Sequence, residues 1–304
     1  MTETASSLFT PFPRREGGRG VRSALRRLAR NRSALVGGLV FGLIVVLALV
    51  GVWATPYDPV KIDTPNRLTE PGLVYWLGTD HFGRDIFSRL LSGAHLSLLI
   101  GLTSVSLAVS LGLLLGLPAG YFGGWLDMLV MRAMDLLLSF PSVLLALGIV
   151  AIVGPSLSNV MLAVGIASVP SFTRLVRASV LSVRTLPYIE AAQATGCGST
   201  RILLRHILPN ILAPLIVLAT LGTAGAILTG AALSFLGLGA QPPTPEWGAM
   251  LNDGRAYFAQ APELMIVPGL AIFVVVALVS WLGDQLMRRY TISADDERLT
   301  HVAA

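Results

Sequence analysis

The chain has 304 residues, of which 54% are hydrophobic and 13% are charged, and its formal net charge is +5. Soluble domains carry about 25% charged residues, so this composition excludes an ordinary soluble protein and indicates one that crosses a membrane several times. The single cysteine, Cys197, excludes an intrachain disulfide and a cysteine-based metal cluster. The positive charge does not indicate nucleic-acid binding, because the arginines gather beside apolar runs, as orientation signals do.

Six apolar runs reach the length of about 20 residues that a membrane-spanning helix needs. They lie at about 34–54, 96–119, 126–153, 158–181, 210–236 and 264–286. The preceding arm, 1–33, holds eight arginines, so the positive-inside rule places it in the cytoplasm. Six crossings then place the tail, 287–304, in the cytoplasm as well. The sequence therefore predicts an all-α polytopic membrane protein with six transmembrane helices and cytoplasmic N- and C-termini.

The extracytoplasmic segment 55–95 contains a charged stretch just before the second span. Thr79 or Asp80 can cap a helix there. Asp80 with Arg84, and Asp85 with Arg89, are acid-before-base pairs at the i, i+4 spacing, each worth about 0.2–0.5 kcal/mol. We expect an interfacial helix that leads into span two. A charged face of that helix, exposed to solvent, is enough to explain these residues.

Charges also occur inside the predicted spans three and four. Asp127, Arg132 and Asp135 lie in the first third of span three. Charged groups deep in lipid are costly and usually face protein or water, and Arg132 can pair with Asp135 at the i, i+3 spacing to brace the bundle. Arg174 and Arg177, late in span four, are expected to reach the cytosolic interface.

A polar island between spans four and five, 187–209, has the pattern of a helix–turn–helix. Pro187 suits a first helical turn, where its missing N–H is not needed, and Glu190 falls near the positive end of the helix dipole. Gly196 ends the first helix, Ser199 can cap the second, and Pro209 ends it. From the pattern alone, a docking surface and an ordinary loop that packs on its own bundle both remain open.

The turn after span five is marked by two glycines and two prolines, Gly237, Gly239, Pro242 and Pro243. Irregular backbone at membrane depth is tolerated where it is buried or lines a cavity. A gate, a receptor-docking loop and a plain exit turn all fit this pattern.

Three blocks of residues resemble one transporter family. Glu190-Ala191-Ala192, then Gly196, then Leu208-Pro209 is similar to the coupling loop of ATP-binding-cassette (ABC) importer permeases, although His206 stands where an aliphatic residue is common. The block 77–85 resembles the dipeptide/oligopeptide/nickel branch of these permeases, and the block 234–248 resembles the C-type subunit of that branch. Gly230 departs from relatives that often carry Glu at this place, which puts a role of that carboxylate in doubt.

The resemblance implies a type I ABC importer permease fold, with a permease core at 96–286. The implied ATPase-coupling residues are Glu190, Ala191, Ala192, Gly196, Arg201, Leu208 and Pro209. The implied extracytoplasmic signature residues are Gly78, Thr79, Asp80, Gly83, Arg84, Asp85, Gly237, Gly239 and Trp247.

The resemblance also implies a bacterial plasma-membrane location and a set of partners. These are a B-type second permease, two ABC ATPase subunits that hold ATP and Mg, and an extracytoplasmic substrate-binding protein. The expected cargo is di- or oligopeptides, with nickel or another small solute as the alternative. The chain itself is expected to bind no cofactor and to have no catalytic or metal site.

Absent motifs agree with a subunit that does not hydrolyse ATP. A Walker A loop needs Gly-Lys-Ser/Thr, and the only lysine, Lys61, lies in Val60-Lys61-Ile62. An ion-driven secondary transporter is the runner-up, and it predicts carboxylates near the bilayer midplane. The middle thirds of spans one, two, four, five and six lack Asp and Glu, which counts against it. A membrane scaffold without transport stays open.

Overall fold

The computed structural model describes residues 42, 46, 50–51 and 54–302. Within these residues the chain forms helices and loops, with one isolated β-bridge between Thr79 and Asp85 and no strand. The prediction of an all-α protein is therefore confirmed for the described residues. The predicted arm 1–33 lies outside them, and so does the first predicted span, 34–54, apart from a few isolated positions.

The helices follow one another with short connections. In chain order they are the 3-10 turn Thr64–Asn66, α3 (Ile86–Phe122), α4 (Gly124–Leu138), α5 (Ser142–Val153), α6 (Leu157–Arg184), α7 (Pro187–Ala194), α8 (Ser199–Arg201), the π-helix Ile202–Ile207, α9 (Leu208–Phe235), α10 (Trp247–Gly254), the 3-10 turn Arg255–Tyr257 and α11 (Glu263–Val302).

Four helical stretches in the described part are long and apolar enough to cross a membrane: α3, α6, Ser199–Phe235 and Glu263–Arg288. A fifth exists only if α4 and α5 count as one span, and the chain bends by 87° between them. The prediction of one span over 126–153 is therefore wrong in its shape. The bend falls before Pro141, which has extended backbone angles and N-caps α5, because a proline disfavours helix at the residue before it.

Two predicted helix starts are also wrong. The expected interfacial helix and span two are one continuous helix, α3, and its N-cap is Asp85 rather than Thr79 or Asp80. The second helix of the polar island is likewise continuous with span five. Pro209 lies in the first turn of α9 and does not end a helix. The N-cap of α8 is Gly198, whereas we expected Ser199.

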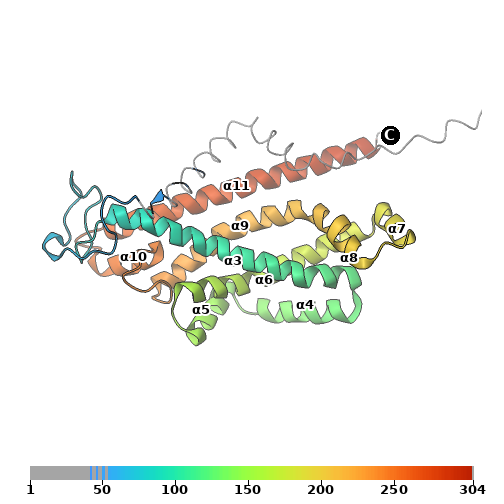
Figure 1. The fold of residues 1–304 in the computed structure, drawn as a ribbon, viewed down its shortest axis with the longest axis horizontal. Helices are drawn as coiled ribbons and strands as arrows, with labels where there is room; N and C mark the ends of the chain where they lie inside the picture. Colours follow the sequence, from blue (N-terminus) through green and yellow to red (C-terminus); the bar gives the residue numbers. More distant parts are fainter. Residues whose placement is uncertain (1–41, 43–45, 47–49, 52–53, 303–304) are drawn as a thin grey trace, which may run out of the picture.

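The long helices run side by side along the long axis of the molecule (Figure 1), and α3 packs against α6 over most of its length. Close approach is possible because α3 presents Gly112, Gly116 and Gly120 to α6. A Cβ atom on Gly116 would lie 2.7 Å from the carbonyl oxygen of Thr173. Small residues serve helix contact in membranes in this way, since apolar side chains gain little by leaving lipid.

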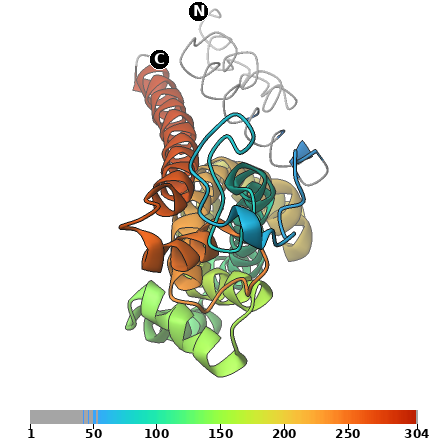
Figure 2. The ribbon, with the colours of Figure 1, turned by 90° about the vertical axis from the view of Figure 1, so that its left-hand side faces the viewer.

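Helices α7 and α8 lie at one end of the bundle, and α10 lies with the loop 54–85 at the other (Figure 1). Figure 2 looks onto this second end, which we call the α10 end, and we call the first the α7 end. One buried core joins α3, α5, α6 and α9 and reaches the α7 end through Ile189 and Ile202. A second core joins α3, α9, α10 and α11 at the α10 end.

Ion pairs link α4 to α6. Asp135 pairs with Arg174 at 2.6 Å rather than with Arg132, and Asp127 binds the guanidinium of Arg177 with both carboxylate oxygens. The expected Arg132–Asp135 pair is therefore wrong, whereas the expected interfacial position of the two α6 arginines stays a prediction: the side chain of Arg174 is 50% exposed while it pairs with Asp135. Helix packing places partners 39 and 50 residues apart within contact, and sequence spacing does not show this.

Candidate functional site

Helix α7 begins and ends as the residue pattern predicted. Pro187 stands in its first turn, and Glu190 is exposed there, near the positive end of the helix dipole. Gly196 has φ +79°, the left-handed conformation that ends helices. Its N–H donates to Gln193 O, and the N–H of Cys197 donates to Ala192 O, which together form a Schellman motif. A Cβ on Gly196 would meet no atom of the described residues within 4 Å, so the backbone conformation, not space, requires glycine here.

The outward face of this loop is open, while its inner face is fixed to the bundle. Glu190, Ala191 and Gly196 are exposed, and the described part of the chain does not cover them. Ile189 is fully buried in the main core and holds α7 in place. Of the other predicted coupling residues, Arg201 and Pro209 are exposed and Ala192 and Leu208 are half-buried. The structure therefore places the predicted coupling residues at the α7 end: Glu190, Ala191 and Ala192 in α7, Gly196 just after it, Arg201 in α8, and Leu208 and Pro209 at the start of α9.

A π-helix, Ile202–Ile207, connects this loop to α9, and sequence reasoning missed it. Ile202 and Ile207 are both buried, at 1% and 0% exposure. In an α-helix two residues five apart point about 140° away from each other, whereas hydrogen bonds of the i→i+5 type bring them to nearly the same face. The π segment thus lets the loop and α9 bury their apolar faces in one core.

A side-chain bridge joins α7 to the start of α9. The amide Nδ2 of Asn210 donates to the hydroxyl of Tyr188 at 3.1 Å and to the carbonyl oxygen of His206 at 2.5 Å. One amide therefore connects the projecting helix, the π segment and α9.

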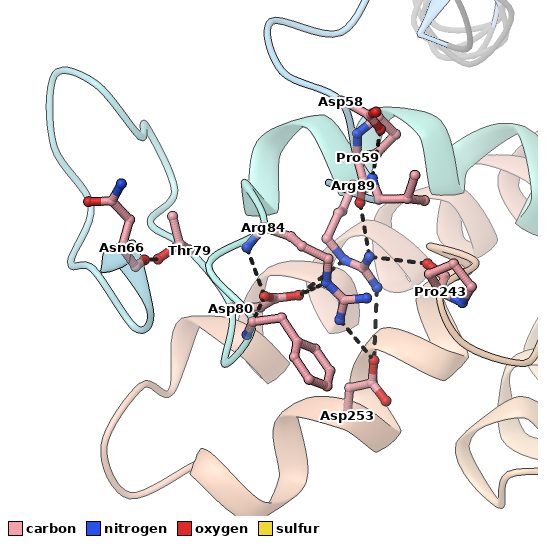
Figure 3. Close-up of polar contacts among 11 residues, drawn as sticks. Asp58, Pro59, Asn66, Thr79, Asp80, Arg84, Arg89, Pro243 and Asp253 are labelled. Atoms are coloured by element: carbon pink, nitrogen blue, oxygen red, sulfur yellow. Dashed lines mark hydrogen bonds and ion pairs between the residues drawn. The ribbon is translucent and has the colours of Figure 1, made fainter. Parts of the chain in front are cut away.

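A buried ion cluster organises the α10 end (Figure 3). Asp80 Oδ2 lies 2.6 Å from Arg84 Nε and 3.5 Å from Arg89 Nε. Asp253, from α10, lies 3.5 Å from Arg84 and 3.9 Å from Arg89. Arg89 also donates to the carbonyl oxygens of Pro59 and Pro243. The cluster thus ties together the loop before α3, α3 itself and the segment after α9.

The predicted solvated helix face is wrong, because the side chains of Arg84 and Arg89 are only 2% and 3% exposed. Asp80 and Arg84 do pair, but in the turn before α3 and not on a helix. Asp85 does not bind Arg89 and instead accepts a hydrogen bond from the N–H of Ser88 at 2.8 Å. The charges are buried because α10, about 170 residues later in the chain, packs over them.

Helix α10 is attached to α3 through Glu246 and Trp247. Glu246 is fully buried and N-caps α10, accepting hydrogen bonds from Gly248 N at 2.9 Å and Ala249 N at 3.0 Å. It also accepts from Ser97 Oγ of α3, at 3.1 Å. Burial raises the pKa of the Glu246 carboxyl, and the hydrogen bonds from the backbone oppose the rise. Trp247 donates from Nε1 to the carbonyl oxygen of Leu90.

The signature glycines serve turns and close contacts in this part of the structure. Gly83 has φ +79°, and a Cβ there would lie 1.8 Å from the carbonyl oxygen of Asp63. Helix α9 ends at Phe235 with Gly237 in the left-handed region, which confirms that span five ends where the two glycines begin. The sequence did not predict the contacts of Arg89, Glu246 and Asp253, because their partners lie in distant segments of the chain.

The long apolar helices of the described residues indicate a multi-pass membrane protein. The chain belongs to the family described as binding-protein-dependent transport system inner membrane component, which matches residues 112–292. Residues 21–71 match the N-terminal TM domain of oligopeptide transport permease C. This confirms the resemblance stated from the sequence blocks.

Relatives cover nearly the whole chain. It is 46% identical over 292 residues to the dipeptide transport system permease protein DppC of Alkalihalophilus pseudofirmus, covering 94% of this chain and 96% of the relative. It is 45% identical to the glutathione transport system permease protein GsiD of Pectobacterium atrosepticum (86% and 87% covered) and 46% identical to that of Escherichia coli (86% of each).

The fold is shared with a solved permease. An inward-facing structure of the MetNI methionine ABC transporter matches with a TM-score of 0.53 and 22% identity, covering 66% of this chain and 95% of that one. The chain is therefore a permease subunit of an ABC importer, located in the bacterial inner membrane.

Proposed function

We propose that this chain forms, with a second permease subunit, the translocation path for short peptides delivered by an extracytoplasmic substrate-binding protein. ATP, with Mg, is hydrolysed on two partner ATPase subunits, and this chain binds no cofactor of its own. The observation that carries the proposal is helix α7, which is anchored by the buried Ile189 and is not covered by the described part of the chain, with Glu190 on its exposed side. Two of the relatives are named for dipeptide and glutathione transport, and glutathione is itself a short peptide, which supports a peptide cargo.

The proposed topology has six spans with both termini in the cytoplasm. The described residues supply up to five spans, and the apolar run 34–54 supplies the first. Arg184, Arg201 and Arg205 lie at or beside the α7 end, which supports a cytoplasmic position for that end by the positive-inside rule. The α10 end then faces the substrate-binding protein.

The proposed mechanism is alternating access driven through α7. When the ATPases close, they move α7, and they can shift the permease only if they bind one of its states more tightly than the other. Ile189 and the Tyr188–Asn210 hydrogen bond pass this movement to the core and to α9. An open, stiff helix with a buried anchor suits this task, because a flexible loop would absorb the displacement.

The test is a charge reversal on α7 with a matched control at the other end. Glu190→Lys should lower peptide uptake and co-purification of the ATPase subunits by about tenfold each, equivalent to about 1.4 kcal/mol of docking free energy. Glu70→Lys makes the same change at an exposed glutamate of the α10 end and should leave ATPase co-purification unchanged. Wild-type uptake and association in Glu190→Lys would contradict the proposal. Uptake of labelled dipeptides, glutathione and Ni²⁺ in a deletion strain identifies the solute.

A further inference from the structure

An open cleft of about 210 Å³ lies at the α10 end, between the loop 56–76 and the first turn of α3. Aromatic rings form much of its wall. The rings of Trp76 and Phe87 are 4.9 Å apart and tilted, and Tyr57 lies on the same cleft. Trp76 is 60% exposed and Tyr57 is 40% exposed, so these rings are accessible to a ligand. Nothing in the coupling mechanism uses this cleft.

A buried carboxylate belongs to the same wall. Asp85 is 3% exposed, and its Oδ2 accepts hydrogen bonds from the N–H and the hydroxyl of Ser88. Through the first of these bonds Asp85 N-caps α3. Its Oδ1 is buried and has no hydrogen-bond partner among the described residues. A buried acceptor without a partner costs free energy. A ligand that donates a hydrogen bond to this oxygen would remove that cost.

The neighbouring charges do not supply that donor. Arg84 and Arg89 form ion pairs with Asp80 and Asp253, so two positive charges balance two negative charges. Among the described residues, Asp85 therefore adds a negative charge that no ion pair balances. A buried charge needs a partner to offset the loss of water, and a cation in the cleft would provide one.

We propose that this cleft binds a cationic organic group, an alkylammonium or a guanidinium, between the rings of Tyr57 and Trp76 and the Oδ1 oxygen of Asp85. Aromatic faces attract such cations, and an ammonium supplies the hydrogen-bond donor that Oδ1 lacks. Asp85 lines the cleft together with Tyr57 and Trp76. The group belongs either to the transported solute or to a lysine or arginine of a protein docked at this end, and the site itself does not depend on the identity of the solute.

The experiment measures binding of n-butylammonium to the permease complex in lipid nanodiscs by saturation-transfer difference NMR at pH 7. Asp85→Asn keeps the helix cap, because asparagine caps helices as well as aspartate does, but it removes the charge. We expect about tenfold weaker binding in this variant. Asp58→Asn is the matched control: Asp58 is exposed in the same loop and accepts from Val60 N, so its loss should leave butylammonium binding unchanged.

A second variant keeps the test valid if Asp85→Asn does not fold. Trp76→Leu removes an exposed ring without leaving a cavity in a core, and it should also weaken butylammonium binding. Neutral n-butanol is the control ligand: any binding signal that it gives should be the same in the wild type and in Asp85→Asn. Equal butylammonium binding in the wild type, Asp85→Asn and Trp76→Leu, or no binding to the wild type, would overturn the proposal.

The two sources of the cation are separated by two further probes. Dialanine carries a peptide amino terminus, and N-acetyl-lysinamide carries a side-chain ammonium only. Asp85-dependent binding of dialanine assigns the site to the solute, whereas Asp85-dependent binding of N-acetyl-lysinamide alone assigns it to a docked protein. Binding of neither probe, together with no butylammonium binding, would sink the proposal and leave the α7 docking test unaffected.

Discussion

Replacing Asp80 with asparagine should destabilise the α10 end far more than the same replacement at Asp253. Asp80 is the closer and more buried partner of the two arginines: its nearest contact is 2.6 Å, against 3.5 Å for Asp253, and its side chain is 7% exposed, against 25%. Its other oxygen also accepts hydrogen bonds from the N–H groups of Phe82 and Arg84. Asparagine at this position leaves the two buried guanidinium groups with one anionic partner, Asp253, which is more distant and 25% exposed.

The magnitudes follow from burial. Removing one member of a buried ion pair costs about 3–5 kcal/mol, because the remaining charge stays buried. A partly exposed pair contributes about 0.2–1 kcal/mol, so Asp253→Asn should cost at most about 1 kcal/mol. The free energy of unfolding, measured by denaturant titration of the purified permease in nanodiscs, distinguishes the two values.

A third variant tests the cause of the loss. In the Asp80→Asn background, Arg84→Met removes one stranded cation and should restore part of the lost stability, since apolar replacement of buried ionic groups is often neutral or stabilising. Equal losses for Asp80→Asn and Asp253→Asn, or a further loss in the double variant, would refute the reasoning that an unpaired buried charge dominates.

Two further predictions concern packing and pH. A Cβ on Gly230 would lie 2.5 Å from a methyl group of the facing helix, whereas one on Gly225 would meet nothing within 4 Å. Gly230→Ala should therefore cost about 1–3 kcal/mol of unfolding free energy and Gly225→Ala should cost none; equal effects in denaturant titration would contradict this. Burial lowers the pKa of His81, whose ring stacks on Tyr257. Because the unfolded chain then binds a proton more readily, stability should fall as pH drops below about 6.5. His81→Phe keeps the stacking and should reduce that slope in thermal scans between pH 7 and 5.

The features that the sequence predicted well are those set by neighbouring residues. The ends of α7 depend on Pro187 and Gly196, which act within one turn of themselves, so the pattern was sufficient. The end of span five depends on Gly237 in the same way. The break within span three was predicted only in part: Pro141 marks a possible kink, but a proline in an otherwise apolar run can either kink a helix or end it, and the sequence does not decide between the two.

The features that the sequence did not predict depend on segments far apart in the chain. The spacing of Asp85 and Arg89 satisfies the i, i+4 rule, yet Arg89 binds Asp80 and Asp253 because α10 folds over it. Glu246 and Ser97 are 149 residues apart, and no local signal relates them. At Gly230 the neighbour that fills the space of a side chain is Ile100, 130 residues earlier in the chain, and no local pattern indicates this contact.

Helix α9 gives the permease a direct mechanical link between its two ends. It begins at the π segment, next to the Asn210 hydrogen bonds that join it to α7. Near its other end it packs closely on α10: a Cβ on Gly248 would lie 2.3 Å from the carbonyl oxygen of Ala231. Helix α10 is in turn held to α3 by Glu246. Close-packed interiors transmit displacement rather than absorb it, so a movement of α7 has to appear at α10 or be taken up in the π segment. The π segment lies between α8 and α9, and Pro214 follows it inside α9, so these are two places in the described helix Ser199–Phe235 where the α-helical hydrogen-bond pattern is interrupted and a movement can be taken up.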